Sequence, residues 1–284
     1  MGILRSVARQ ANKISRDTRD HHARALHGGV IALMPGEPVL TARLAELLGV
    51  APGERAGADL LVIPLAPWDS AQFACAEVAA RARQGKRTLV VVIGSAEDRP
   101  GREAELLAAP DVTIGDLTFA PDAQSDRSVA LIMDGVIRAL GNEMVSAARR
   151  HPSLRAAVRH HVVDVAAREA AAAGALNWFA GAAAAQQAMV VRIGSSEGRA
   201  MGVARIPEIV AATGAGFVTG VVARGASRIV PAPRWMVRGA VAWASTVALA
   251  AATERIARHV GEDIDPVSAL KGLVAARFGR KGEV

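Results

Sequence analysis

Short apolar runs alternate with segments of helical periodicity in the first half of the chain. Residues 29–49, GVIALMPGEPVLTARLAELLG, have the pattern of a strand, a sharp turn and a helix. A second helix is expected between Asp69, its cap, and Gly85, which closes it. Further runs have the Val, Ile and Leu content of parallel strands covered on both faces: 58–65, 87–94 and, as a candidate fourth strand, 111–117. The pattern predicts a small doubly wound parallel sheet of the α/β class.

The second half of the chain is helical in texture and rich in alanine from about Ser128 onward. Three of its stretches contain no charged residue: 170–191, 209–223 and 239–253. A helix that spans a membrane needs about 20 predominantly apolar residues, so the second and third stretches are short, and the first is mostly alanine. The pattern favours the buried helices of an all-α bundle, and a membrane hairpin stays open as the alternative.

We predict four parts from these patterns. Residues 1–27 have the periodicity of an amphipathic helix, which either docks on the protein itself or lies on an anionic lipid surface. Residues 28–125 form the α/β domain, 126–261 the helical domain, and 262–284 a C-terminal helix or tail. With 284 residues and 51% hydrophobic content, the chain can bury two ordinary cores.

Charge and cysteine content narrow the classes of partner. A net charge of +7 favours an anionic partner, meaning a membrane surface or a nucleic acid. Nucleic acid is the weaker option, because only 3% of the residues are aromatic and no nucleic-acid-binding motif is present. The single cysteine, Cys75, excludes an intrachain disulfide and a cysteine-rich metal site.

Composition also indicates where the protein is found. Arginine dominates the basic residues, alanine abounds and tyrosine is absent, which indicates a GC-rich bacterial coding sequence. The N-terminus has charged residues every few positions and lacks the apolar segment of a secretory signal. We therefore expect the bacterial cytoplasm, at or in the inner membrane, and no export.

The turn at residues 34–41, MPGEPVLT, occupies the place of a phosphate-binding loop with the pattern G-x-x-x-x-G-K-[ST]. Met34 and Val39 replace the glycines and Leu40 replaces the lysine, so only the threonine remains. Loss of the lysine removes a charge-assisted contact of about 1.5–3 kcal/mol. Glu37 repels phosphate, and the two prolines of the loop lack amide donors. We therefore expect poor nucleotide affinity.

The later part of this domain resembles the second half of a small GTPase domain in its layout. Residues 94–97, GSAE, stand where an N-K-x-D motif contacts guanine, and a shift of one position brings in Asp98 as the acid. Only nine residues, 50–58, separate the first helix from the next strand, which leaves no room for switch loops or a magnesium-binding D-x-x-G element. The resemblance implies a degenerate P-loop GTPase-like domain, with Gly36, Thr41 and Asp98 as weak candidates for nucleotide contacts.

A basic connection joins the second and third uncharged stretches. It carries four arginines beside a tryptophan: Arg224, Arg228, Arg234, Arg238 and Trp235. Pro231 and Pro233 stiffen the turn between them. Such a loop suits anionic lipid headgroups, since each arginine near such a surface contributes about 1 kcal/mol. Solvated surface charge is the alternative interpretation.

Residues 150–261 follow a recurring pattern. A glutamine and a methionine lie three apart, a glycine follows after one more helical turn, a basic and an acidic residue open the next helix, and an alanine-rich helix with a threonine follows a proline turn. These positions are Gln186, Met189, Gly194, Arg205, Glu208 and Thr246. The pattern resembles the bacterial GTPase-associated helical family, domain of unknown function 697. The resemblance implies association with membranes and with an Era-like or dynamin-like GTPase domain, which is degenerate in this chain.

These features favour a non-catalytic, membrane-proximal helical protein with a pseudo-GTPase domain. It would act as a scaffold, or as the partner of an active GTPase or of a second copy of itself. One alternative is an atypical GTPase or ATPase that contacts phosphate through Gly36, Thr41 and arginines donated by a partner. The other is an integral membrane protein with a helical hairpin at 209–223 and 239–253. We expect no metal and no other cofactor.

Overall fold

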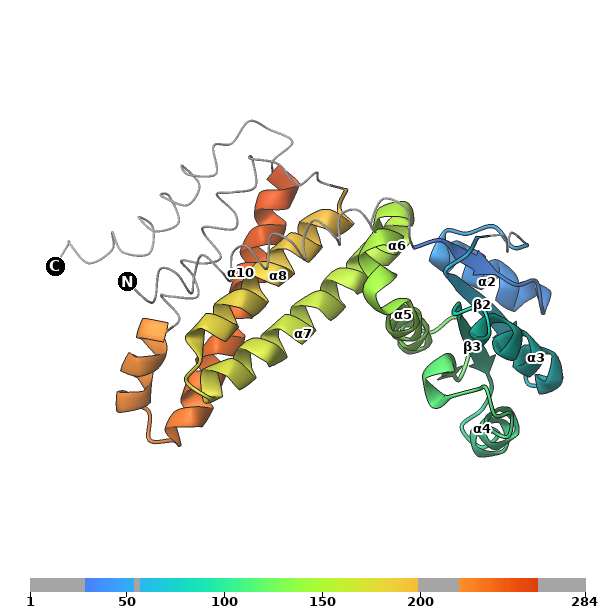
Figure 1. Ribbon diagram of the computed structural model, residues 1–284, viewed down its shortest axis with the longest axis horizontal. Coiled ribbons are helices and arrows are strands. Elements are labelled where there is room, and N and C mark those ends of the chain that lie inside the picture. Colours follow the sequence, from blue (N-terminus) through green and yellow to red (C-terminus); the bar gives the residue numbers. More distant parts are fainter. Residues whose placement is uncertain (1–28, 54–56, 199–219, 260–284) are drawn as a thin grey trace. The chain divides into compact units, whose positions relative to one another are not determined.

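A computed structural model describes three parts of the chain: residues 29–53, 57–198 and 220–259 (Figure 1). The chain divides into two compact units. These are the α/β unit, Met1–His161 with Ser195–Gly198, and the helical unit, Val162–Gly194 with Arg199–Val284. The predicted N-terminal helix (1–27) and C-terminal tail (262–284) lie outside the described residues.

Four parallel strands form the sheet of the α/β unit: β1 (Ile31–Leu33), β2 (Leu60–Leu65), β3 (Arg87–Ile93) and β4 (Leu117–Ala120). Every residue of β1 and β2 is buried, as is the middle of β3, because both faces of the sheet are covered. This burial explains why the strands appear in the sequence as continuous apolar runs. The predicted parallel sheet of an α/β unit is confirmed.

The order of the strands differs from the prediction. It is β1-β2-β3-β4, and each strand pairs in parallel with the next one along the chain. A doubly wound sheet requires a reversal of this order, with later strands added on the other side of β1. Because the described strands show no reversal, the doubly wound topology predicted from the sequence is wrong. Alternation of strands and helices predicts parallel pairing, but it does not determine the side on which each strand is added.

Helices cover both faces of the sheet. α3 (Ala71–Ala82) and α4 (Arg99–Leu107) share one core with side chains from all four strands, among them Ala32, Leu61, Ile63, Val90, Val92 and Leu117. On the opposite face lies α5 (Asp126–Leu140), where a methyl group at Gly135 would collide with Thr118 of β4. Leu117 and Thr118 point to opposite faces because side chains alternate along a strand.

α2 (Pro38–Leu48) follows β1 after a four-residue turn, as the sequence predicts. It begins at a proline, whose missing N–H costs nothing at the first helical position. It ends at Gly49, whose φ of 64° lies in the left-handed region that favours glycine. The buried face of α2 carries four residues: Leu40, Thr41, Leu44 and Leu48.

Two predicted boundaries shift by a few residues. α3 is capped by Ser70, whose hydroxyl accepts a backbone hydrogen bond from the first turn, whereas the Asp69 carboxylate accepts from the preceding loop. The fourth strand begins at Leu117, at the end of the predicted run. The preceding residues form a 3-10 turn, η1 (Ile114–Asp116), because Asp116 accepts hydrogen bonds from the Thr113 N–H (2.9 Å) and hydroxyl (2.7 Å).

The segment after α5 belongs to the α/β unit. It comprises η2 (Gly141–Glu143), α6 (Met144–Arg150), η3 (Pro152–Leu154) and the first part of α7 (Arg155–Ala175). Arg87 of β3 holds the end of α5 by donating hydrogen bonds to the carbonyls of Ala139 (3.0 Å) and Leu140. The boundary expected between residues 125 and 126 therefore falls inside the α/β unit, since α5 buries its apolar face on the sheet.

The helical unit contains the rest of α7 together with α8 (Phe179–Ser196), helical residues 220–229 and α10 (Arg234–His259). α7 and α10 approach closely at glycines, since a Cβ at Gly174 would lie 2.8 Å from the Ala242 Cβ and 2.9 Å from the Arg238 carbonyl oxygen. Five buried alanines fill the space between the helices: Ala170, Ala173, Ala182, Ala185 and Ala242. The predicted alanine-rich helical packing is thus present in the described residues.

Candidate functional site

The turn between β1 and α2 is occupied by the protein's own side chains. The Glu37 carboxylate accepts hydrogen bonds from the backbone N–H groups of Val39 (3.1 Å) and Leu40 (2.6 Å). The Gly36 N–H donates to the Thr41 hydroxyl (3.0 Å). Amides of this kind are the donors with which a phosphate-binding loop holds its ligand. Gly36 and Thr41 are therefore brought together, but they bind each other.

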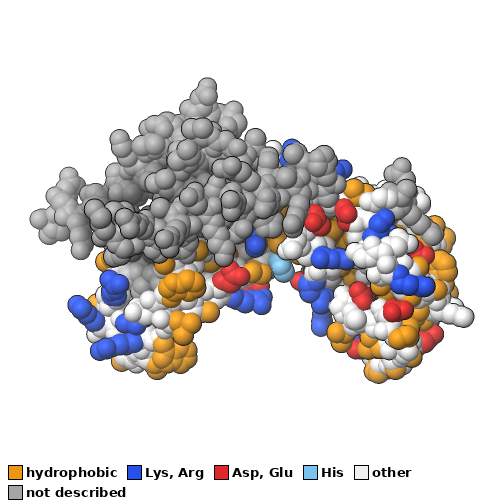
Figure 2. Space-filling model, in the orientation of Figure 1, with side chains coloured by type: hydrophobic (Ala, Val, Ile, Leu, Met, Phe, Trp, Pro, Cys, Tyr) orange, Lys and Arg blue, Asp and Glu red, His pale blue; other side chains and the backbone are white. Residues whose placement is uncertain are grey.

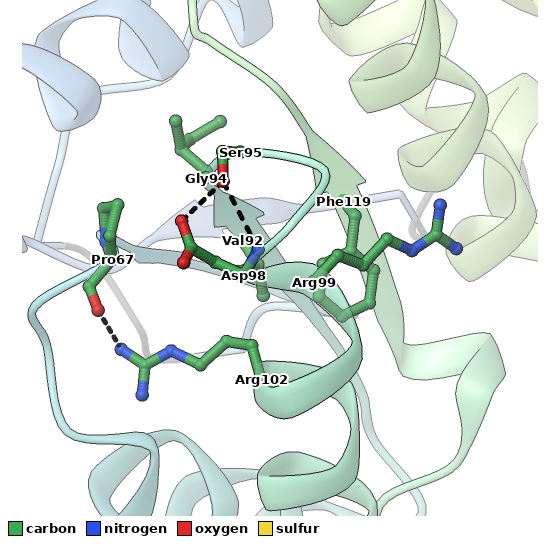
Figure 3. A pocket seen from close by; sticks show the side chains of 9 residues that line it. Pro67, Val92, Gly94, Ser95, Asp98, Arg99, Arg102 and Phe119 are labelled. Atoms are coloured by element: carbon green, nitrogen blue, oxygen red, sulfur yellow. Dashed lines mark hydrogen bonds between the residues drawn. The ribbon is translucent and has the colours of Figure 1, made fainter.

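A pocket of about 270 Å³ lies at the carboxyl ends of β2, β3 and β4 (Figure 3). The candidate residue Asp98 lines it, and its carboxylate accepts a hydrogen bond from the Ser95 hydroxyl (2.6 Å). The same hydroxyl accepts from the Asp98 N–H (3.3 Å). Neither Gly36 nor Thr41 is among the residues that line this pocket. The three weak candidates for nucleotide contacts therefore do not form one site.

Two arginines of the pocket make internal contacts. Arg102 donates to the Pro67 carbonyl (2.8 Å), as Figure 3 shows, and it pairs with Glu105 (2.6 Å). Arg99 lies over the Phe119 ring, 5.0 Å from its centroid, and pairs with Glu103 (3.5 Å). These contacts fix α4 against the strand ends. An anionic ligand would have to compete with carboxylates for both guanidinium groups.

The described part of the chain contains no group of three or more His, Cys, Asp or Glu side chains arranged to hold a metal. Burial raises the pKa of the Cys75 thiol, and the nearby Glu105 carboxylate adds to the effect. A raised pKa disfavours the thiolate, which is the nucleophilic form of cysteine. Cys75 is therefore interpreted as a packed residue of α3 and not as a nucleophile.

Gln186 and Thr246, two residues of the family pattern, contact each other in the helical unit. The Gln186 amide Nε2 donates to the hydroxyls of Thr246 (3.0 Å) and Ser245 (3.1 Å). Met189 is buried one turn further along α8, and Gly194 is buried in its last turn. The remaining two residues, Arg205 and Glu208, lie outside the described residues. The contact explains why a glutamine and a threonine occur among alanines.

The basic connection lies on the surface of the helical unit. Arg224, Arg228 and Arg234 are exposed, and Arg238 is partly buried. Trp235, in the first turn of α10, exposes 60% of its surface. Next to these arginines lie further exposed apolar side chains: Val221, Val222, Ile229, Val230 and Met236. Exposed tryptophan and aliphatic side chains beside arginines are the composition expected of a surface that meets lipid headgroups.

One helix among the described residues is long and apolar enough to cross a membrane by length and composition alone. It is the segment Arg234–Glu254 of α10, which has a mean hydropathy of 1.3. A third of its most apolar stretch of 18 residues is buried within the protein. α10 begins before the uncharged stretch 239–253 and includes Arg234 and Arg238 in its first turns. The other stretch of the predicted hairpin, 209–223, lies mostly outside the described residues.

Comparison of the chain with models of protein families, with curated proteins and with solved structures found no match. Sequence reasoning missed two groups of residues near these sites. Glu37 was interpreted only as a repulsive charge, although Pro38 at the first helical position marks its predecessor as a helix cap. Leu176 and Trp178 were missed because they lie within the uncharged stretch 170–191, where a turn separates α7 from α8.

Proposed function

We propose that this protein is a non-catalytic, membrane-proximal helical protein whose α/β unit is a degenerate GTPase-like domain. In the bacterial cytoplasm, at the inner membrane, it serves as a scaffold or as the partner of an active GTPase or of a second copy of itself. The observation that carries the proposal is the exposed Trp235 among Arg224, Arg228 and Arg234. The sequence contains no acidic residue between positions 220 and 253.

Three features of the α/β unit support the absence of nucleotide chemistry. Glu37 and Thr41 occupy the amides of the loop that would hold phosphate. The order of the described strands has no reversal, and such a reversal is the point at which open α/β sheets form their ligand crevice. Asp98 lies in a pocket that neither Gly36 nor Thr41 lines. Among the described residues, the atypical GTPase or ATPase hypothesis therefore has no assembled phosphate site.

Binding to vesicles tests the proposal. Full-length protein should sediment with vesicles of phosphatidylglycerol and phosphatidylcholine, but not with phosphatidylcholine alone, and high salt should weaken this binding as it screens the charges. Replacing Arg228 and Arg234 together by alanine should lower the affinity by about 2 kcal/mol, or roughly thirtyfold. The matched control replaces Arg83 and Arg127, exposed arginines of the α/β unit, and should bind like the wild type.

Equal binding to both vesicle types, or equal effects of the two double variants, would contradict the proposal. Nucleotide turnover is assayed on the same preparation with GTP and with ATP, in the presence of magnesium, with and without vesicles. Nucleotide hydrolysis faster than in buffer without protein, in either condition, would show that the protein is an enzyme and would contradict the proposal that it is non-catalytic.

The length of α10 favours a second candidate, an integral membrane protein. Its 21-residue segment Arg234–Glu254 is about 31 Å long at 1.5 Å per residue, which matches the roughly 30 Å hydrocarbon core of a bilayer. A spanning helix resists both high salt and alkaline carbonate. Cell membranes washed in these two ways separate the candidates, since a surface contact through arginines is released by salt and a spanning helix is retained by both washes.

A further inference from the structure

The turn between α7 and α8 exposes two large apolar side chains. Asn177 takes a left-handed conformation (φ 59°), and the N–H groups of Asn177 and Trp178 donate to the carbonyls of Gly174 (3.0 Å) and Ala173 (2.8 Å). This pattern is the Schellman motif, which ends a helix sharply. Leu176 exposes 80% of its surface and Trp178 exposes 58%.

The Trp178 side chain is held in place on this turn. A methyl group at Gly181, in the first turn of α8, would collide with its indole ring, so the ring lies directly against that helix. One face of the ring is therefore covered by α8, and the rest stays exposed. A tryptophan fixed in this way presents a defined apolar surface with little side-chain entropy left to lose.

The start of α10 lies at the same end of the helical unit. A Cβ at Gly239 would lie 3.2 Å from the Ala171 carbonyl oxygen and 3.7 Å from the Ala175 Cβ. The last turn of α7 therefore packs on the first turns of α10, which brings Leu176 and Trp178 to the end of the unit that carries Trp235. Figure 1 shows this turn and the beginning of α10 together at the lower end of the helical unit.

The turn between α7 and α8 and the turn at residues 230–233, which precedes α10, together form one surface, which we call the apolar tip. Its members are Leu176, Trp178, Ile229, Val230, Trp235 and Met236, all exposed. In Figure 2 hydrophobic and basic side chains are grouped at the lower left, where this end of the helical unit lies. The described residues of the helical unit contain no Asp or Glu in the ranges 170–194 and 220–253, so the charge that these two ranges contribute is entirely positive.

We infer that the apolar tip inserts into the interfacial layer of an anionic bilayer, with Trp178 and Trp235 as its two anchors; this inference rests on the proposed function. Tryptophan prefers the headgroup level of a membrane because its ring is amphipathic. Arginines beside an apolar surface, here Arg228 and Arg234, complement anionic headgroups. Insertion by the tip leaves the rest of α10 in the bundle, where Thr246 is hydrogen-bonded to Gln186.

Single-tryptophan proteins test the inference. The chain has four tryptophans, so three substitutions by phenylalanine leave one reporter, at Trp68, Trp178, Trp235 or Trp243. Each protein is bound to phosphatidylglycerol-containing vesicles whose acyl chains carry bromine either near the headgroups or near the chain ends. Sedimentation measures binding in the same samples, and circular dichroism confirms that each variant is folded.

We expect shallow bromine to quench the Trp178 and Trp235 reporters, and Trp68 and Trp243 to stay bright. Trp68 is the matched control, because it is 76% exposed but lies in the α/β unit. Trp243 distinguishes the tip from a spanning helix. It lies eight residues beyond Trp235, or about 12 Å along α10, near the middle of Arg234–Glu254.

Three outcomes would overturn the inference and leave the proposed function standing, because sedimentation still reports binding. Quenching of Trp235 without Trp178 shows that the α7–α8 turn stays out of the membrane. Strongest quenching of Trp243 by deep bromine shows that α10 spans the bilayer. Binding without quenching of any reporter shows that arginines alone hold the surface. If the wild-type protein does not bind the vesicles at all, the proposed function itself is refuted.

Discussion

The Gln186 side chain on α8 donates a hydrogen bond of 3.0 Å to the Thr246 hydroxyl on α10, and both side chains are fully buried. The Thr246 hydroxyl donates in turn to the Ala242 carbonyl of its own helix (2.8 Å). Alanines surround this contact, and alanines pack almost equally well in several registers. A buried polar pair has its partner in only one of them. The hydrogen bond therefore fixes the register of α8 against α10.

Substitution of either residue should destabilise the helical unit. Thr246→Val keeps the shape of the side chain but leaves the buried Gln186 amide with Ser245 alone, which should cost about 1–3 kcal/mol. Gln186→Leu should cost less, because both hydroxyls still donate to the Ala242 carbonyl and the substitution also removes the Gln186 Oε1, which is buried without a hydrogen-bond partner among the described residues. The double variant should cost less than the sum, and urea unfolding of all four proteins measures the difference. Strictly additive effects would mean that the hydrogen bond contributes nothing.

The close approach of α7 and α10 predicts opposite effects at two helical glycines. Gly174→Ala should destabilise the protein by about 1–3 kcal/mol, because the new methyl group meets the Arg238 backbone carbonyl, which cannot rotate away. Gly225→Ala is the control, since nothing lies within 4 Å of its Cβ position, and it should gain up to about 1 kcal/mol of helix propensity. Thermal unfolding of both variants checks the signs, and a stabilised Gly174→Ala protein would contradict the observed packing.

The α/β unit was the easier half to predict. Strands β2 and β3 begin and end within two residues of the expected runs, because a strand buried on both faces leaves a continuous apolar segment in the sequence. Strand order was not predictable in this way. It depends on the side of the sheet to which each crossover returns, and no single residue encodes that choice.

The helical half was harder because alanine has little preference for burial. The stretch 170–191 has no charged residue, yet it contains the turn at Asn177 and parts of two helices. Asn177 itself was the available signal, since asparagine tolerates the left-handed conformation that ends a helix. Gln186 and Thr246 were selected only as members of a family pattern. Their contact joins residues 60 positions apart and arises from tertiary packing.

The turn at 34–41 predicts a stability effect without a nucleotide effect. Glu37→Ala should destabilise the protein by about 0.5–2 kcal/mol, because the carboxylate caps two amides at the start of α2. Glu46→Ala is the control, since its pair with Arg43 lies at the surface and should contribute less than about 1 kcal/mol. Thermal shift assays with millimolar GTP and magnesium should leave the melting temperature of wild type and both variants unchanged. A nucleotide-induced rise in any of them would contradict the interpretation of this loop.

The position of His151 predicts how stability depends on pH. This side chain lies between α6 and η3, and its Nε2 atom is buried without a hydrogen-bond partner among the described residues. Burial lowers the pKa of His151 below its ordinary value of 6.5, a hydrogen bond with the Gly49 backbone partly offsets this, and Arg150 lowers it further. The unfolded chain therefore binds a proton at a higher pH than the folded protein does.

The sign of the effect follows from proton linkage. Well above pH 6.5 the imidazole is neutral in both states, so His151 gives no pH dependence there. As the pH falls below 6.5, the unfolded state takes up the proton first, and the free energy of unfolding decreases until the folded-state pKa is reached. His151→Gln should remove this part of the pH dependence, whereas His160→Gln, at an exposed position, should keep it. Urea unfolding at pH 7.5 and at about pH 5.5 measures how much the free energy of unfolding falls with pH in the wild type and in the two variants. An equal fall in all three proteins would show that His151 is accessible to protons in the folded state.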